Sequence, residues 1–271
     1  MTSIHPSEDP PLGWCVPCLV VRDIQTTLDF YAKMDLLPYG GNPADGWSML
    51  RNRAIEIHVF EGRHIDKDLV NLRGGDLPRI REVLAARGFE THKVLGEHSF
   101  IYLDPDGREV FFDSSPEETA EYESGQRLTG LPKEADVHAG TGLDLGNLTW
   151  CLACGDLGRT SVFYERLGFV PGDGEPEKGR SLLARRDHLP GPGIRLLTTT
   201  LTLCEGTIPA DTLSFRGGHV AEIASALQAR GLDIGAGVQR ATDGGESLLL
   251  VDPDDHPLFF DTPPSERLYR R

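Results

Sequence analysis

The sequence predicts an α+β protein built from four β-α-β-β-β modules in two similar halves. Its 271 residues suit two domains of ordinary size. Strand-type alternation and helix-type periodicity follow one another in the same order in both halves. The chain also repeats itself. Three runs recur in the same order: Phe30-Tyr31 as Phe163-Tyr164, Arg73-Gly74-Gly75 as Arg216-Gly217-Gly218, and Asp104-Pro105-Asp106 as Asp252-Pro253-Asp254. We therefore predict domains at 14–113 and 147–262, a linker at 114–146, and tails at 1–13 and 263–271.

The first module begins with an apolar run at 16–21, which is typical of a short buried strand. Asp23 follows as a helix N-cap, because its carboxylate can accept from the first free backbone N–H groups. Ile24 and Tyr31 lie on one face of the helix that it starts. Two alternating stretches at 48–51 and 54–60 complete the module as strands.

The second module restarts with a strand at 68–73 and a helix capped by Asp76. Gly88 is expected just after this helix, where a left-handed residue ends it. Strands at about 99–103 and 108–113 flank an Asp-Pro-Asp-Gly turn. The linker is rich in Pro, Glu, Gly and Thr, and one short helix is expected within 116–126.

The charge balance narrows the class of partner. There are 42 acidic and 27 basic residues, a net charge of −15, so the surface would repel nucleic acid and anionic lipid. No apolar run approaches the length of a membrane span. Five cysteines are a low and odd number, which does not suit a disulfide framework. The N-terminus lacks the pattern of a secretory signal. We expect a cytoplasmic protein, a monomer or a homodimer, with a neutral or cationic partner.

The module order, the run Phe163-Tyr164-Glu165-Arg166-Leu167-Gly168-Phe169 and the Asp-Pro-Asp turn before each final strand resemble the vicinal oxygen chelate superfamily. This superfamily includes glyoxalase I, extradiol dioxygenases, fosfomycin-resistance enzymes and bleomycin-resistance proteins. The resemblance covers nearly everything outside the linker and tails. It implies two glyoxalase-like domains, each with a strongly curved, cup-shaped mixed sheet. It leaves open whether modules pair within a half or across halves.

The resemblance also implies where a metal would be held. The ligand positions in this chain carry residues without suitable donors: Val16, Phe111, Thr149 and Phe259, with Leu69 and Thr212 near the second-module positions. Divalent ions need carboxylate or imidazole ligands, so we predict no metal and no other cofactor. A divalent ion stays open as a remote alternative, with His58 or His98 joining Glu56.

Glu56 sits at a ligand position of the family, and His58 lies two residues on, on the same face of its strand. In a half-dry cup the pair would serve as acid and base, with burial raising the pKa of the glutamate. Alternatively, Glu56 pairs with an arginine such as Arg51 or Arg53, and His58 faces solvent at the end of the sheet.

Further residues are predicted to line the cups and to contact a ligand. The set is Trp14, Cys18, Trp47, Phe60 and Phe111 in the first half, and Thr149, Cys151 and Phe259 in the second. The two Cys-X-X-Cys runs place their thiols on opposite strand faces, which favours packing over zinc binding. Arg73 and Arg216 precede helices, and we expect them on the surface.

We therefore predict a protein that binds an organic small molecule in a metal-free cup, similar to the bleomycin-resistance branch. The alternative is a metal-independent isomerase, lyase or hydroxylase of secondary metabolism that uses Glu56 and His58. A metal-dependent glyoxalase or dioxygenase is the remote alternative.

Overall fold

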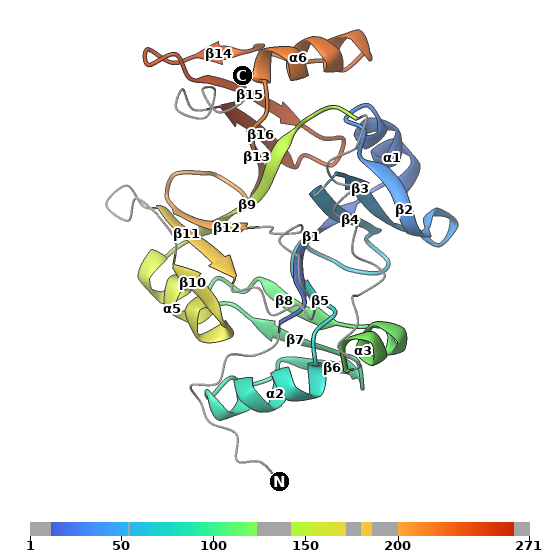
Figure 1. Cartoon of the computed structure of the whole chain (residues 1–271), viewed down its shortest axis with the longest axis vertical. Coiled ribbons are helices and arrows are strands. Elements are labelled where there is room, and N and C mark those ends of the chain that lie inside the picture. The colour runs from blue at the N-terminus through green and yellow to red at the C-terminus, as the bar shows by residue number, and fades with distance from the viewer. Residues whose placement is uncertain (1–11, 54, 124–141, 172–179, 186–199, 263–271) are drawn as a thin grey trace.

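The chain forms two eight-stranded mixed sheets, one in each half (Figure 1). The computed structural model describes residues 12–53, 55–123, 142–171, 180–185 and 200–262. In Figure 1, α2 and α6 lie at the two ends of the long axis, with the other modules between them. Within the described part, no helix has the length and apolar character that a bilayer crossing requires.

The first half contains two β-α-β-β-β modules and a final helix. The elements are β1 (Trp14–Val21), α1 (Ile24–Ala32), β2 (Leu37–Asn42), β3 (Trp47–Asn52), β4 (Ile55–Glu61), β5 (Leu69–Arg73), α2 (Leu77–Ala86), β6 (Lys93–Gly96), β7 (Ser99–Leu103), β8 (Glu109–Asp113) and α3 (Pro116–Glu123). Asp23 and Asp76 cap α1 and α2 as predicted, and Gly88 has a positive φ of 78°. The short helix expected in the linker is α3.

The second half repeats the order, which confirms the prediction of four modules. Its elements are β9 (Gly146–Cys154), α5 (Leu157–Leu167), β10 (Phe169–Pro171), β11 (Arg180–Arg185), β12 (Thr200–Glu205), β13 (Thr212–Gly217), α6 (Val220–Ala229), β14 (Gln239–Arg240), β15 (Glu246–Val251) and β16 (Pro257–Thr262).

Two strands of the first half left no recognisable pattern in the sequence. β2 and β6 are the outermost strands of their sheet, and nearly all of their residues are exposed. A strand that buries neither face has no reason to alternate apolar and polar residues. Hydrogen bonding to the neighbouring strand therefore defines them, and sequence patterning does not.

Modules pair within each half, which answers the question that the resemblance left open. β1 runs antiparallel to β5, with Trp14 opposite Arg73 and Cys18 opposite Leu69. β9 and β13 make the same antiparallel seam in the second half. Each half is consequently one continuous sheet.

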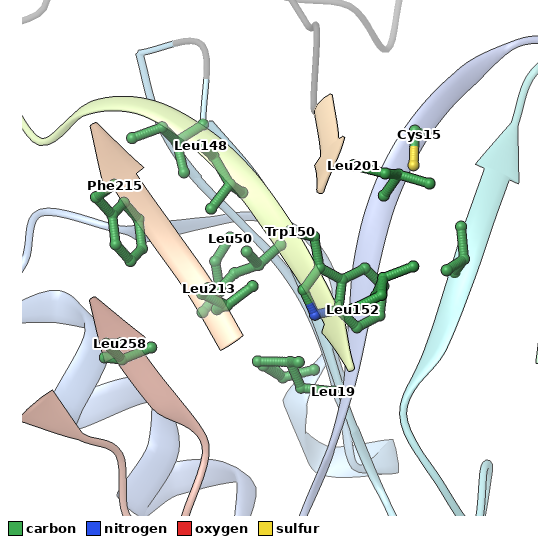
Figure 2. Close-up of a cluster of buried hydrophobic side chains, with 14 of the residues drawn as sticks. Cys15, Leu19, Leu50, Leu148, Trp150, Leu152, Leu201, Leu213, Phe215 and Leu258 are labelled. Atoms are coloured by element: carbon green, nitrogen blue, oxygen red, sulfur yellow. The ribbon is translucent and has the colours of Figure 1, made fainter. Parts of the chain in front are cut away.

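Each sheet has two different faces. One face packs against helices, and its side chains belong to a hydrophobic core that spans both halves. Figure 2 shows Leu148, Trp150 and Leu152 of β9 in this core with Cys15 and Leu19 of β1. We call the opposite face, which carries the alternate residues of each strand, the cup face. Candidate binding residues lie there.

The turn before β8 joins the first half to the second through buried charges, which we call the first clasp. The Oη of Tyr164 donates to the Oδ2 of Asp104 at 3.2 Å. Arg108 also binds Asp104, and its Nε and Nη2 donate to the two carboxylate oxygens of Asp211 at 2.7 and 2.8 Å. Arg108 additionally donates to the carbonyl of Ala153 at 2.9 Å. One guanidinium therefore links carboxylates from both halves.

The turn before β16 makes a matching second clasp onto the first half. The Oη of Tyr31 donates to the Oδ2 of Asp252 at 2.9 Å. His256 bonds Asp252 through Nδ1 at 2.8 Å and Asp68 through Nε2 at 3.2 Å. His256 stands where the first clasp has Arg108, four residues after the first Asp of each turn. The sequence pattern of these aspartates indicates only a turn.

His256 makes the second clasp sensitive to pH. Burial alone would lower its pKa, but hydrogen bonds to Asp252 and Asp68 raise it to about 10. Its contribution to stability is therefore complete below pH 6.5, the value of a free histidine, and is lost as the pH rises through about 10. We expect His256→Ala to cost about 1.5–3 kcal/mol at pH 7, the range for hydrogen bonds to charged groups.

Urea unfolding at a series of pH values tests this. His256→Arg copies the first clasp, and we expect it to retain stability between pH 7 and 10.5 better than the unmodified protein. If the unmodified protein and His256→Arg lost the same free energy of unfolding between pH 7 and 10.5, the raised pKa would not belong to His256.

Candidate functional site

Strand pairing aligns one row of residues across each cup face. In the second sheet Thr149 pairs with Thr200 on one side and with Ser214 on the other, and Ser214 pairs with Phe259. Leu249 is opposite Phe259 and ends the row. This row therefore contains two of the second-half positions that the resemblance assigns to a metal, Thr149 and Phe259.

The first sheet has the equivalent row. Val16 pairs with Asn71, and Asn71 pairs with Phe111. Cys18 pairs with His58, and the same register two residues earlier places Glu56 beside Val16. Glu56 and Thr200 are thus counterparts in the two sheets.

The residues at these positions do not fit a metal ion. The second-module members of the rows are Asn71 and Ser214, which corrects the sequence-based choice of Leu69 and Thr212, two residues away. A row of Thr149, Ser214 and Phe259 offers hydroxyl groups and a phenyl ring, but neither carboxylate nor imidazole. Among the residues that the structure describes, no three His, Cys, Asp or Glu side chains are grouped so as to share a metal.

Glu56 is the centre of a buried polar cluster in the first cup. Its Oε1 lies 2.8 Å from the Nε2 of His58, and its Oε2 accepts from Arg51 at 2.7 Å. The hydroxyl of Tyr39 donates to the same carboxylate, and the Arg51 guanidinium lies 3.7 Å from the centre of the Tyr39 ring. Glu56 and His58 are each only 1% exposed. The alternative in which His58 faces solvent is therefore wrong, whereas the pairing of Glu56 with Arg51 is confirmed.

The environment of Glu56 keeps it ionised. Burial acts to raise its pKa, but the hydrogen bond and charge of His58, together with Arg51, outweigh burial and lower the pKa to about 2. The expected net rise in the pKa of Glu56 is wrong, because His58 and then Arg51, which lies opposite Glu56 in the strand pair, offset the effect of burial. A carboxylate held this acidic is a weak base.

Further polar residues share the first cup. Arg73 is held by Glu118 of α3 at 2.9 Å rather than lying on the surface. Among the described residues, the buried polar atoms without a protein partner include the Nε1 of Trp14, the Oδ1 of Asn71 and the Oδ1 of Asp113. Buried polar groups of this kind are usually satisfied by internal water. Asn71 and Asp113 are not among the residues predicted from the sequence, although each lies two residues from another cup-face residue, Arg73 on β5 and Phe111 on β8.

The predicted ligand-lining residues of the first cup lie at different depths. Trp14 and Cys18 are fully buried. Trp47 and Phe60 stack with ring centres 6.1 Å apart and are half-buried, as is Phe111. His98, the alternative metal partner, lies before β7 and has no contact with Glu56 among those described. The deep part of this cup is thus filled by its own side chains.

The second cup is more open. Thr149, Cys151 and Phe259 are all half-buried, and so are Thr200, Thr202 and Ser214. The hydroxyl groups of Thr149 and Thr200 are hydrogen bonded at 2.7 Å. Leu249 is 58% exposed beside Phe259. Hydroxyl groups and apolar side chains are therefore both partly exposed to solvent on this face.

The cysteines lie as strand geometry predicts. Cys15 and Cys154 belong to the hydrophobic core, while Cys18 and Cys151 lie on the cup faces. These four cysteines and Cys204 form no disulfide among the described residues. Burial raises the pKa of the Cys18 thiol.

Solved structures with a similar fold include homoprotocatechuate 2,3-dioxygenases and a catechol dioxygenase. Homoprotocatechuate 2,3-dioxygenase from Brevibacterium fuscum, in complex with 3,4-dihydroxyphenylacetate, is 16% identical with a TM-score of 0.56 over 97% of this chain and 84% of that chain. The enzyme of the same name from Arthrobacter globiformis has the same identity, TM-score and coverage. A halotolerant catechol dioxygenase is 16% identical, with a TM-score of 0.54 over 94% and 87% of the two chains. No family model and no curated protein sequence matches. At this identity the likeness shows the fold alone.

Proposed function

We propose that this chain, which has the two-domain fold of the vicinal oxygen chelate superfamily, binds a small organic molecule in its second cup without a metal ion. The function resembles that of the bleomycin-resistance branch, in which binding rather than chemistry protects the cell.

One observation carries the proposal: the aligned row of Thr149, Ser214 and Phe259. The positions that the family uses for a metal carry hydroxyl groups and an aromatic ring here. Such a surface contacts apolar and hydrogen-bonding groups of a ligand directly, which is the usual chemistry of a small-molecule site.

Exposure favours the second cup over the first. Val16, Glu56 and Asn71 in the first row are at most 2% exposed, and the Glu56 carboxylate is already bonded to Tyr39, Arg51 and His58. The equivalent row in the second half is half-buried, so a ligand can reach it without unpacking the interior.

Ligand binding before and after treatment with EDTA tests the proposal. Saturation-transfer NMR with small aromatic alcohols should detect binding that persists after EDTA and weakens several-fold in Phe259→Ala. Phe111→Ala, the equivalent change in the first cup, is the matched control and should leave binding unchanged. One equivalent of metal that survives dialysis, with binding lost on its removal, would contradict the proposal.

A second candidate function is metal-independent catalysis in the first cup, with Glu56 and His58 as the acid and base. The observation that favours it is the continuous hydrogen-bonded chain from Tyr39 through Glu56 to His58. In this arrangement the glutamate would orient the imidazole, and His58 would transfer the proton. Turnover of a bound ligand that disappears in His58→Ala, while binding persists, would favour catalysis over binding alone.

A further inference from the structure

We infer that the ligand of the second cup is uncharged, with an oxygen-bearing edge over the threonines and serine and a hydrocarbon edge over Phe259 and Leu249. This inference rests on the proposed function and adds the chemical class and orientation of the ligand.

The cup face of the second sheet can be mapped row by row. The central row runs Leu249, Phe259, Ser214, Thr149, Thr200 across five strands. The next row runs Val251, Pro257, Thr212, Cys151, Thr202 over the same strands. In both rows the residues of β15 and β16 are apolar, and those of β13, β9 and β12 carry hydroxyl groups, apart from the thiol of Cys151. The face is therefore divided lengthwise into a hydrocarbon strip and a hydroxyl strip.

Neither strip offers a counter-ion. No Asp, Glu, Lys, Arg or His occurs in the two rows, so an ionic group seated there would lose water without gaining an opposite charge. Along β13 and β16 the charged positions next to the central row are Arg216 and Asp261, which pair in the sheet register. Their opposite charges largely cancel for a ligand lying across the central row.

Hydroxyl groups suit a neutral oxygen function. Each threonine or serine hydroxyl can donate one hydrogen bond and accept others, so it can pair with a hydroxyl or a carbonyl group. Thr149 and Thr200 already share one hydrogen bond at 2.7 Å, which leaves one hydroxyl hydrogen of the pair to donate. Phe259 and Leu249, side by side, provide the adjacent apolar contact.

The contrast with the first cup supports this reading. The equivalent positions there include Glu56, and Arg51 lies opposite it. The net charge of −15 is thus a property of the whole chain and does not extend to the second cup. The sequence-based expectation of a neutral or cationic ligand narrows to a neutral one.

Three probes of nearly the same size test the inference: benzyl alcohol, benzoate and benzylammonium. Titration of the full chain, followed by NMR at low and high salt, should show benzyl alcohol binding at least about tenfold more tightly than either ion, a difference of about 1.4 kcal/mol. Its affinity should not change with salt.

Two variants test the orientation. Thr149→Val should weaken benzyl alcohol several-fold and leave toluene unchanged, whereas Phe259→Ala should weaken both. Unchanged unfolding midpoints would show that the variants remain folded.

The outcomes separate the inference from the proposed function. Benzoate or benzylammonium binding in this cup as tightly as benzyl alcohol would overturn the neutral class and leave metal-free binding intact. Failure of every probe, toluene included, to bind at millimolar concentration would count against both.

Discussion

Arg108→Ala is expected to destabilise the folded chain by about 3–5 kcal/mol, the cost of leaving a buried charge unpaired. The guanidinium is 9% exposed, and its partner Asp104 is fully buried at 0%. Removing the arginine leaves Asp104 and Asp211 facing each other across the two halves. Urea unfolding at pH 7 measures the loss.

Arg108→Lys separates charge from geometry. Lysine keeps the positive charge, but it cannot present the two parallel N–H groups that Arg108 directs at Asp211. We expect a smaller loss than for alanine.

Arg63→Ala is the control for the first clasp. Arg63 pairs with Glu61 at 3.2 Å but is 55% exposed, so its loss should cost less than about 1 kcal/mol. Equal losses for Arg63→Ala and Arg108→Ala would show that the clasp adds nothing beyond an ordinary surface ion pair.

Glu56→Gln is expected to cost about 3 kcal/mol at pH 7. A fall in pKa from 4.5 in the free residue to about 2 in the folded protein corresponds to roughly this free energy. Glutamine preserves the volume, but its single oxygen cannot serve Tyr39, Arg51 and His58 as a carboxylate does, and its amide group would face donors.

The pH dependence of this loss follows from the direction of the shift. The folded-state pKa is lowered, so the stabilisation by Glu56 is complete above pH 4.5 and is lost as the pH falls through about 2. We expect the difference between the unmodified protein and Glu56→Gln to shrink steadily across this range, measured by urea unfolding.

Glu82→Gln is the matched control, because Glu82 is 58% exposed and its ion pair with Arg79, at 3.5 Å, lies on the surface. It should change stability by less than about 0.5 kcal/mol. A deficit of Glu56→Gln that stays constant between pH 5 and 2 would contradict the assigned pKa. If Glu56→Gln is less stable and the unmodified protein turns over no bound ligand, the cluster has a structural role and not a catalytic one.

The sequence predicted elements best where each residue's neighbours along the chain determine its environment. The caps Asp23 and Asp76 act on backbone groups three residues away, so their role is visible locally. β2 and β6 were missed because their structure depends on β3 and β7, their only sheet neighbours.

The candidate site was predicted in part for the same reason. Glu56 and His58 lie on one strand, and alternation alone placed them on one face. Asn71 and Ser214 were missed because a position in the row depends on the register of an antiparallel seam, where a shift of two residues keeps the face but changes the neighbour.

The sequence by itself determined that the chain has four similar modules and that the positions which the family resemblance assigns to metal ligands carry Val16, Phe111, Thr149 and Phe259, because patterning and side-chain chemistry are properties of the residues themselves. Only the tertiary structure decided that modules pair within halves, that the first cup is filled and the second open, and that Glu56 stays ionised. Those features depend on distant partners: on strand register, and on which charges are brought together away from water.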